Sequence, residues 1–368
     1  MKRIMWISII IIATLLTTTI IVMGQSKFGQ LPRGERLARI KQSPNYRDGE
    51  FRNLTETPLM TNDDGFLKSI YNFMFKKVPG LNPKDSIPVV KTNLWEIPMD
   101  NNVLVWFGHS SYYMQINGKR LLVDPVLSNH ASPFSWMIKA FKGTDHYQTA
   151  DIPDIDYLMI THDHWDHLDY QTIQKIHPRV KQFICGLGVG AHLEHWGVNA
   201  ERITEMDWYD STVPTEGWKI HALPARHFSG RGLKRNQTLW VSFVLETPDL
   251  KLFLGGDGGY GSHFSEIGNQ FGPFDLAVLE QGQYNHKWKH IHLLPEQLFT
   301  AVNDLQAQKV LPVHHSKFVL AEHPWSEPLS LLQENNVNFV PLLTPMIGKP
   351  AFFNDTVHSF QQWWLELN

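Results

Sequence analysis

The segment Ile160–Asp169 reads ITHDHWDHLD, and six of its ten residues carry an imidazole or a carboxylate: His162, Asp163, His164, Asp166, His167 and Asp169. Its first two residues end YLMIT, residues 157–161, a short apolar run that predicts a buried strand. Side chains two positions apart in an extended segment project to the same side, so His162 and His164 can bind one metal ion at about 2.0–2.1 Å. A solvated loop, a helix N-cap or a single structural ion are simpler interpretations, but such a density of histidine is unusual in a loop.

Further metal ligands are needed, because one loop does not complete two sites. A bend in the cluster would direct Asp166 and His167 to a second ion about 3.5–4 Å from the first. Three more donors stand at the ends of predicted strands: His227 follows IHALPAR, Asp257 ends LFLGGD and His314 ends VLPVH. A lone histidine at a strand end is usually a hydrogen-bonded core or surface residue, but three such donors in this chain favour metal binding. The glycines of GGDGGY permit the close approach that a bridging carboxylate needs.

Composition narrows the class of protein. The 368 residues include 42% hydrophobic and 12% aromatic side chains, enough for one large domain or two ordinary ones. The formal net charge of −3 and the lack of a basic stripe argue against a nucleic-acid partner. Cys185 is the only cysteine, so neither an internal disulfide nor a sulfur-rich zinc site can form. Any metal must be bound by histidines and carboxylates, which suit zinc, iron or manganese.

The N-terminus is a candidate membrane anchor. Lys2 and Arg3 precede an uncharged run of about 20 residues, the length that crosses a hydrocarbon core of roughly 30 Å. The apolar region of a cleaved signal peptide is usually only about 7–15 residues long, so we favour an uncleaved anchor. A buried core helix is disfavoured because the run is apolar on every face. Basic residues flank both ends, so the positive-inside rule gives no clear orientation. The expected organisation is a membrane segment at 1–25, an extended arm at 26–95 and a folded domain at 96–368.

The order of the predicted elements indicates an α/β fold. Strands come first in a run and then alternate with helices, which predicts packed sheets with helices outside. The dipeptide Asn117-Gly118 favours a type I′ hairpin. Strands are expected at 103–107, 157–161, 182–185, 202–206, 218–225, 239–246, 251–257, 275–280 and 309–315, and helices near Gly65–Lys77, Pro295–Leu305 and Glu327–Glu334. The C-terminal FQQWWLELN is expected to dock on the core rather than on lipid.

At this point a family resemblance can be stated. THDHWDH looks like the HxHxDH signature of the metallo-β-lactamase superfamily, and the later donors resemble its third histidine, bridging aspartate and last histidine. The resemblance spans residues 102–322. It is most similar to the branch of N-acylphosphatidylethanolamine-hydrolysing phospholipase D and its bacterial relatives, through VWFGHSSYYMQINGKRLLVDP, ITHDHWDHLD, LPARHFSGRG, GGDGGY, HIHLLPEQ and VHHSKF. It implies a four-layer αββα sandwich with an N-terminal membrane segment.

The resemblance also implies roles for individual residues. The first metal would be bound by His162, His164 and His227, the second by Asp166, His167 and His314, and Asp257 would bridge them. Asp169 would orient a ligand histidine. His109 would support the site rather than bind metal, and His292 would donate a proton or contact the oxyanion. His164 stands where oxygen-reducing di-iron relatives have Glu, so the implied cofactor is a pair of zinc ions.

The sequence departs from the branch at several positions. Asp163 stands where Asn is frequent, and Arg226 stands where Gln is common. HHSKF replaces a His-Trp-Gly-Thr-Phe-like segment, which places Lys317 near the site. Lys317 and Arg226 can be interpreted as ligands for an anionic head group or as solvated surface residues. His315 can compete with His314 for the ligand position, although a strand that alternates faces directs only one of them to the rim.

The implied function is zinc-dependent hydrolysis. The expected reaction is phospholipase D-like cleavage of N-acylphosphatidylethanolamine-type or related lipids, with catalytic roles for Asp257 and His292 and a hydroxide supplied by the two metals. Lactonase or other ester hydrolase activity is the main alternative. An RNA-processing nuclease is disfavoured by the charge, and a non-catalytic membrane-tethered protein by the full set of seven donors. The domain would lie outside the cytoplasm, in the periplasm if the chain is bacterial, and oligomers remain possible.

Overall fold

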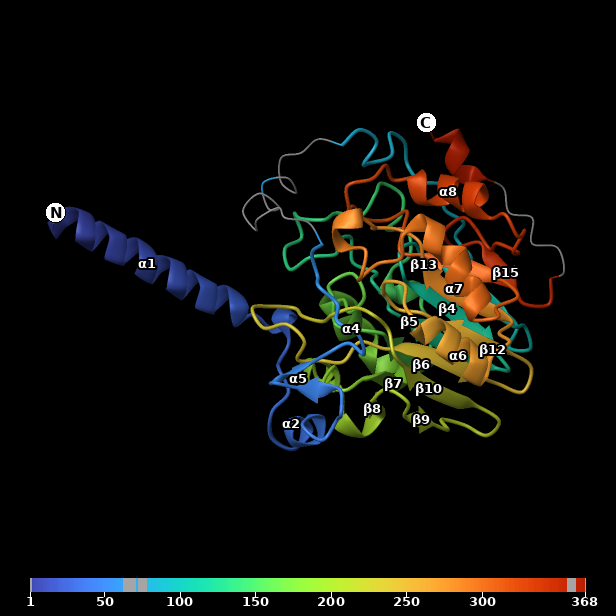
Figure 1. Ribbon diagram of the computed structural model, residues 1–368, viewed down its shortest axis with the longest axis horizontal. Helices are drawn as coiled ribbons and strands as arrows, with labels where there is room; N and C mark the ends of the chain where they lie inside the picture. The colour runs from blue at the N-terminus through green and yellow to red at the C-terminus, as the bar shows by residue number, and fades with distance from the viewer. Residues whose placement is uncertain (1, 62–70, 72–77, 356–361, 368) are drawn as a thin grey trace.

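Two β-sheets lie face to face in the computed structural model, which describes residues 2–61, 71, 78–355 and 362–367 (Figure 1). The first sheet contains, in spatial order, β15 (Pro350–Phe352), β3 (Val103–Trp106), β4 (Tyr112–Ile116), β5 (Lys119–Val123), β6 (Ile155–Ile160), β7 (Val180–Gly186) and β8 (Ile203–Met206). The second contains β14 (Val310–Val313), β13 (Leu276–Glu280), β12 (Lys251–Leu254), β11 (Ser242–Glu246), β10 (Lys219–Leu223) and β9 (Ser211–Thr212).

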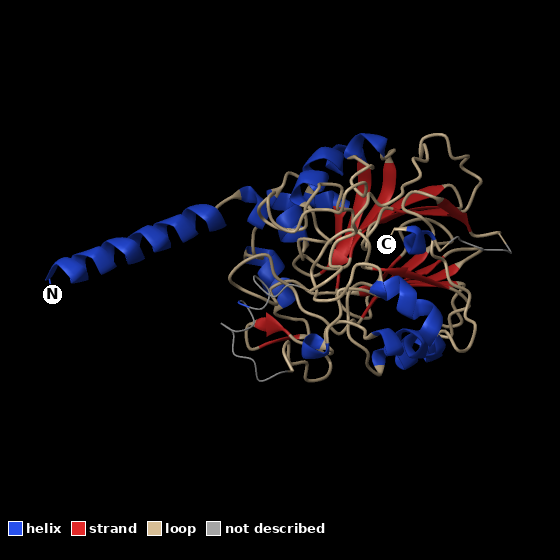
Figure 2. Cartoon of the chain, turned by 90° about the horizontal axis from the view of Figure 1, so that it is seen from above, coloured by secondary structure: helices blue, strands red, loops and turns tan. Residues whose placement is uncertain are grey.

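Alternating side chains explain why the sheets stack with helices outside. In β3, Leu104 and Trp106 belong to the core that the two sheets share, whereas Val103 and Val105 belong to a second core on the other face. That second core includes residues of α4 (Tyr170–Ile176) and α5 (Gly190–His195). The helices α6 (His263–Phe271) and α7 (Leu298–Asp304) pack on the second sheet, and helices flank both sheets in Figure 2. The four-layer αββα prediction is confirmed.

The predicted hairpin is confirmed by its backbone angles. Asn117 has φ of 47° and Gly118 has φ of 72°, and a type I′ turn requires positive φ at both central residues. The turn sets Ile116 opposite Lys119, so β4 and β5 pair in the register that buries Met114 against Leu121.

Some elements differ from their predicted bounds. The run 239–246 becomes a strand only at Ser242, because Leu239 and Val241 first donate backbone hydrogen bonds to Leu187 and Thr161 near the first sheet. The helix expected at 295–305 begins as a 3₁₀ turn, Pro295–Gln297, before α7. The helix at 327–334 is confirmed as α8 (Glu327–Asn335). The helix expected at Gly65–Lys77 lies outside the described residues, apart from Tyr71.

The two ends of the chain behave differently. The helix α1 (Lys2–Met23) is long and apolar enough to cross a membrane by length and composition, none of its apolar window is buried, and it projects away from the sheets (Figure 1). At the other end, Trp363 and Trp364 are buried in the main core, so the C-terminal segment docks as expected.

The segment after α1 lies against the domain. It contains α2 (Gly34–Ile40) and a two-stranded hairpin, β1 (Tyr46–Arg47) and β2 (Glu50–Phe51). Ile40 and Phe51 are fully buried in the main core. Asn53 accepts a hydrogen bond from the backbone N–H of His227 (3.2 Å) and donates one to its carbonyl (2.7 Å). The arm therefore fixes the backbone of His227, a predicted metal ligand, through Asn53.

Many of the loops that follow strands lie at one edge of the two sheets, which we call the rim, because these strands run in matching directions. In the first sheet β5 and β6 are parallel, and in the second β12, β13 and β14 are parallel. Two antiparallel pairings, β10 with β11 and β11 with β12, make β10 run the same way as β12. Carboxyl ends of parallel strands meet at one edge of a sheet, where ligands bind in open α/β sheets.

The close contact of α6 with α7 gives a stability prediction. A Cβ added at Gly268 would lie 1.9 Å from the Asp304 carbonyl oxygen, so backbone must shift. Gly268→Ala should lower the free energy of unfolding by about 1–3 kcal/mol through overpacking, although alanine favours helices by about 1 kcal/mol. Exposed Asn269, on the same helix, is the control, and Asn269→Ala should stay within about 0.5 kcal/mol of the parent. Urea unfolding in detergent measures both, and an equally stable Gly268→Ala variant would contradict the packing.

Candidate metal centre

The rim brings together all seven side chains that the sequence predicts as metal ligands. They come from four loops: His162, His164, Asp166 and His167 follow β6, His227 follows β10, Asp257 follows β12, and His314 directly follows β14. All seven are buried except His164, which is partly exposed. Their donor atoms form overlapping groups in which every atom lies within 4.8 Å of the others.

One group consists of three imidazoles, which we call the three-histidine group. His162 Nε2 lies 2.9 Å from His164 Nδ1, and His227 Nε2 lies 3.2 Å from the same nitrogen. Burial and the neighbouring imidazoles hold the pKa of His162 well below its usual value, and burial does the same for His227. The neutral imidazole is the form that binds metal. Three converging neutral imidazoles are a typical zinc ligand set.

A second group combines Asp166, His167 and His314, which we call the aspartate–histidine group. His314 Nε2 lies 3.3 Å from Asp166 Oδ2, and His167 Nε2 lies 3.6 Å from it. Although burial opposes a charged imidazole, the charge of Asp257 raises the pKa of His314 to about 10 and that of His167 well above its usual value. The raised pKa values favour protonated imidazoles beside the carboxylates, and a metal ion bound there would replace those protons.

Asp257 lies between the two groups. Its Oδ2 is 3.0 Å from His314 Nε2 and 3.2 Å from His167 Nε2, and it is 3.9 Å from Nε2 of both His162 and His227. Burial disfavours the ionised carboxylate, but the neighbouring imidazolium charges outweigh it and hold the pKa of Asp257 well below its usual value. One ionised carboxylate therefore faces both sets of donors.

An unpaired buried oxygen indicates that the donor set fits a metal ion. Asp257 Oδ1 is buried and makes no hydrogen bond within the described part of the chain. An unsatisfied buried polar atom costs about 1–3 kcal/mol, so it needs a partner. Because Oδ2 of the same carboxylate lies near both groups, a cation bound beside Asp257 would satisfy Oδ1. The residues present therefore fit two ions bound by imidazoles and carboxylates.

Gly256 allows the Asp257 loop to approach Thr161 closely. A Cβ at Gly256 would lie 2.7 Å from the Thr161 side chain, just before His162. A larger residue would push the Asp257 loop away from β6, so the role expected for the glycines of GGDGGY is confirmed at this position.

A buried carboxylate that the sequence analysis missed supports both groups. Asp124 accepts a hydrogen bond from His167 Nδ1 (2.8 Å) and one from the Thr161 hydroxyl (2.6 Å), and that hydroxyl lies 3.0 Å from His162 Nδ1. These contacts orient the opposite nitrogens of both rings toward the centre. Asp124 directly follows β5, so the strand-end rule that identified Asp257 applies to it too.

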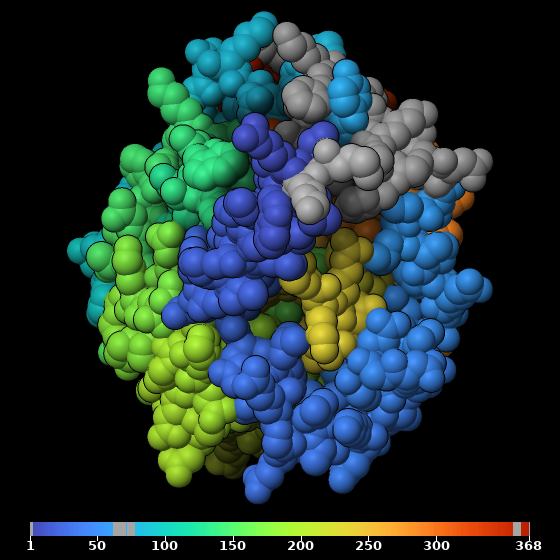
Figure 3. Space-filling view, turned by 90° about the vertical axis from the view of Figure 1, so that its left-hand side faces the viewer, coloured from blue at the N-terminus to red at the C-terminus, as the bar shows by residue number. Residues whose placement is uncertain are grey.

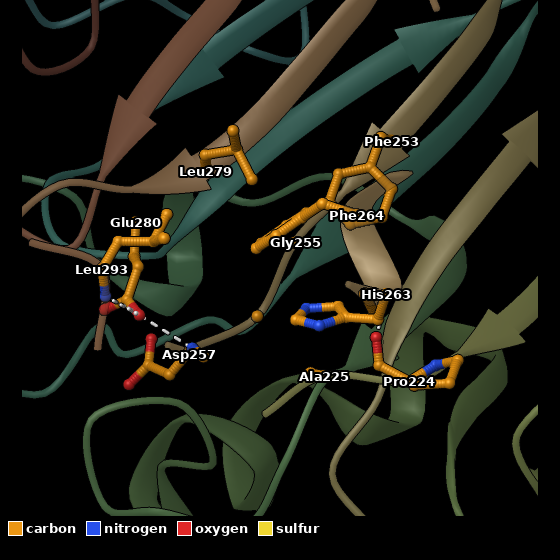
Figure 4. A pocket seen from close by; sticks show the side chains of 13 residues that line it. Pro224, Ala225, Phe253, Gly255, Asp257, His263, Phe264, Leu279, Glu280 and Leu293 are labelled. Atoms are coloured by element: carbon orange, nitrogen blue, oxygen red, sulfur yellow. Dashed lines mark hydrogen bonds between the residues drawn. The ribbon is translucent and has the colours of Figure 1, made fainter. Parts of the chain in front are cut away.

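Glu280, the last residue of β13, is a second missed carboxylate. Its Oε2 lies 2.6 Å from His292 Nδ1 and 3.4 Å from His314 Nδ1, while its Oε1 accepts the N–H groups of Gly258 and Leu293. Figure 4 shows Glu280 beside Asp257 at one end of a small cavity of about 10 Å³, with His263 at the other end. Glu280 thus connects the Asp257 loop to His292.

The predicted role of Asp169 is wrong. Its carboxylate accepts hydrogen bonds from the backbone N–H groups of Gln171 and Thr172, from the Thr172 hydroxyl and from Ser128, so it caps α4. A residue that begins a helix directs its side chain to the free N–H groups of the first turn. Asp124 makes the histidine contact expected of Asp169.

Neither interpretation of Lys317 holds. Only 2% exposed, it donates to the carbonyls of Phe107 (3.1 Å) and Val126 (2.9 Å), and burial lowers its pKa to about 8. It joins the loop that carries His109 to the loop that carries Asp124, and it is neither a head-group ligand nor solvated.

Arg226 and His315 are also accounted for. Arg226 donates to Thr57 and to the carbonyls of Glu56 and Tyr260, so it fastens the arm. His315 contacts Ser316, the Pro312 carbonyl and the Trp106 ring, away from the donor groups. His314 alone of the adjacent pair faces the rim.

Two further histidines lie next to the donors. His109 Nε2 contacts Asp166 Oδ2 at 2.8 Å, which fits a residue that orients this carboxylate. The His292 ring is 5.1 Å from that of His227 and stacks on that of His314 at 5.2 Å. His292 is partly exposed, so it borders both the donors and solvent.

The Asp124 and Asp169 assignments give a paired prediction. Asp124→Asn should lower zinc affinity about tenfold with the fold retained, because it removes the charge that orients His167 and, through Thr161, His162. Asp169→Asn, the control, should leave zinc affinity unchanged and lower stability by about 1 kcal/mol or less through the cap of α4. Chelator-competition titration and thermal unfolding distinguish them. Equal zinc affinity in Asp124→Asn and the parent would show that Asp124 does not orient the ligand histidines.

Comparisons with known proteins agree with this geometry. The family described as "Beta-lactamase superfamily domain" matches residues 119–315. An uncharacterized protein of Mycobacterium bovis is 39% identical over 314 residues that cover 84% of each chain. An N-acyl-phosphatidylethanolamine-hydrolyzing phospholipase D of Caenorhabditis elegans is 27% identical over 331 residues, covering 76% of this chain and 91% of that protein.

A solved structure supports the fold alone. The metallo hydrolase Igni18 of the archaeon Ignicoccus hospitalis superposes with a TM-score of 0.54 at 18% identity, over 70% of this chain and all of that one. The family match over more than half of the chain and the 39%-identical relative establish the superfamily. The chain belongs to the β-lactamase superfamily and is a metal-dependent hydrolase of its metallo-β-lactamase fold.

Proposed function

We propose that the protein is a membrane-anchored zinc phosphodiesterase that cleaves N-acylphosphatidylethanolamine-type or related lipids in a phospholipase D-like reaction. The observation that carries the proposal is the position of Asp257, whose Oδ2 lies within 3.9 Å of histidines from both donor groups. The similarity to the Caenorhabditis elegans phospholipase D over most of its length supports the substrate class.

In this proposal the three-histidine group holds one zinc ion, the aspartate–histidine group holds the other, and Asp257 contributes to both. Zinc is favoured because the donors are mainly imidazoles, whereas harder carboxylate sets better suit iron. When bound, two such ions supply hydroxide at neutral pH and positive charge beside a phosphoryl oxygen. The residues of the chain would hold the metal ligands in position, keep the centre buried and supply the proton that the leaving group needs.

In this proposal His292 would act on the leaving group. A new bond forms between the water oxygen and phosphorus, and the bond from phosphorus to the head-group oxygen breaks. His292 would give its proton to that leaving oxygen, and Glu280, 2.6 Å from its other ring nitrogen, would stabilise the protonated ring. The side chain borders solvent, as a donor to a departing alcohol must.

α1 would hold the enzyme in its substrate's bilayer. Its 22 residues are enough to span a hydrocarbon core, and its apolar window makes no buried contact with the domain. An uncleaved span with the domain outside the cytoplasm, in the periplasm of a bacterium, completes the proposal.

Substrate profiling tests the proposed function. The full chain in detergent should hydrolyse N-acylphosphatidylethanolamine and p-nitrophenyl phosphodiesters in preference to lactones and carboxylic esters. Removal of metal with a chelator should abolish turnover, and zinc should restore it. Asp257→Ala, with the fold retained, should be inactive. Lactone hydrolysis exceeding that of the diesters would contradict the proposal and favour the ester hydrolase alternative.

His292→Gln tests the proton donor. The variant should lose about 10²–10⁴ in kcat on a lipid with an alcohol leaving group, the range of general acid catalysis, and much less on a p-nitrophenyl diester, whose leaving group needs no proton. Zinc content should be unchanged. Equal losses on both substrates would mean that His292 does not protonate the leaving group.

A further inference from the structure

The segment that follows α1 is fastened to the metal-binding loop. Trp196 donates its indole N–H to the Ser26 carbonyl at 2.7 Å, and the Phe28 ring packs edge-on against the Trp165 ring with centroids 5.2 Å apart. Trp165 lies between the predicted ligands of the β6 loop. The segment just after α1 is therefore fastened to the β6 loop, which carries four of the predicted ligands.

A buried arginine strengthens this connection. Arg231, 4% exposed, donates to the carbonyls of Asp163 (2.8 Å) and Leu168 (2.6 Å) in the β6 loop and to that of Lys27 (3.0 Å) after α1. Its guanidinium also lies 4.0 Å from the centroid of the Trp165 ring. The planar guanidinium of arginine binds several acceptors at once, so Arg231 holds the segment just after α1 against the β6 loop.

Two loops expose apolar side chains beside the same junction. Leu233 is 79% exposed, and a Cβ on its neighbour Gly232 would lie 2.5 Å from Met23, the last residue of α1. Trp136 is 71% exposed and stacks on Phe134. In Figure 3 the yellow atoms of the Leu233 loop lie beside the dark-blue N-terminal residues.

Cations accompany these apolar side chains. Lys234 and Arg235 follow Leu233 and are exposed. Lys27 Nζ lies 4.7 Å from the centroid of the Phe134 ring, next to Trp136. An exposed apolar side chain flanked by basic ones matches the surface of a membrane, where apolar groups enter the acyl boundary and basic groups meet anionic head groups.

We propose that Trp136 and the segment 233–235 form a docking surface for an anionic lipid bilayer at the base of α1. Tryptophan favours the membrane–water interface, the Leu233 side chain would leave water, and the cations would meet lipid phosphates. The inference rests on the proposed membrane anchor and deepens it, because it assigns the face of the domain that lies on the bilayer.

The docking surface continues into the metal centre. Arg235 lies over the Phe228 ring at 5.5 Å, and that ring packs against the His164 ring at 4.4 Å. Phe228 directly follows the predicted ligand His227. A lipid head group held at Arg235 would be separated from the three-histidine group by the Phe228 ring, so a bilayer substrate would approach the centre from the docked face.

A fluorescence experiment on the full chain tests the surface. Cys185 is the only cysteine and is fully buried, so an introduced cysteine can be labelled alone. Leu233→Cys would carry a nitrobenzoxadiazole label in vesicles of phosphatidylcholine and phosphatidylglycerol. The label should emit at shorter wavelength than in detergent-free buffer and be quenched by nitroxide lipids. The control is Val337→Cys, because Val337 is 73% exposed and lies two residues after α8, an element that is away from α1 in Figure 1; its label should report water. Water-like emission at both positions would overturn the docking surface.

A variant that removes two positive charges tests whether the docking surface prefers anionic lipid. In the labelled Leu233→Cys protein, Lys234→Gln with Arg235→Gln should reduce quenching to the level found in vesicles of phosphatidylcholine alone. Quenching that is equal in both lipid mixtures and unaffected by these substitutions would overturn the role of anionic lipid.

A third label separates this inference from the anchor on which it rests. Ala13→Cys lies in the middle of α1. Quenching at Ala13→Cys together with Leu233→Cys supports both proposals. Quenching at Ala13→Cys alone overturns the docking surface and leaves the anchor, whereas its absence at both positions overturns the anchor and the surface together. Zinc content of each labelled protein, equal to that of the parent, shows that the domain is folded.

Discussion

The site depends on one electrostatic requirement, the need of the buried Asp257 carboxylate for positive charge. An ionised carboxylate removed from water is strongly unfavourable unless it is paired. Asp257 meets imidazoles on two sides, at 3.0 and 3.2 Å on the aspartate–histidine side and at 3.9 Å on the three-histidine side. The raised pKa values of His167 and His314 favour their protonated forms, whose charge balances that of Asp257. A metal ion bound beside Asp257 would balance it better, because it would also satisfy Asp257 Oδ1.

The fold meets this requirement by aligning strand ends. The β5, β6, β10, β12 and β14 strands run in matching directions within their sheets, and each presents a polar side chain just beyond its carboxyl end. Each strand is packed in an apolar core, so the donor side chains just beyond the strand ends are held in fixed positions. Asp124 then couples the two groups, since it contacts His167 directly and His162 through Thr161. The second layer of carboxylates is thus part of the same strand-end arrangement.

Much of this arrangement was predictable from the sequence, because local patterns encode it. Apolar runs located most strands, and the polar residue after each run located the donors. Asp124 and Glu280 were missed although the same rule covers them, since a single carboxylate after a strand carries no signal until its histidine partner is known. Asp169 was misassigned because its sequence neighbours are ligands, whereas its side chain caps a helix that the sequence analysis did not identify.

Other features depend on long-range contacts and leave no local pattern. The burial of Lys317 results from two carbonyls that lie 210 and 191 positions away along the chain. Asn53 also depends on a long-range contact, because it hydrogen-bonds to the backbone of His227 from a segment that the sequence predicts to be a polar arm. Only the assembled fold shows that this arm contacts the backbone of a predicted ligand and that Arg231 joins the β6 loop to the segment just after α1.

Anomalous diffraction at the zinc edge, from crystals of the zinc-loaded protein, tests the central claim most directly. The account predicts two peaks about 3.5–4 Å apart, on either side of Asp257, one beside His164 and the other beside His314. A single peak, or peaks not in contact with Asp257, would contradict it.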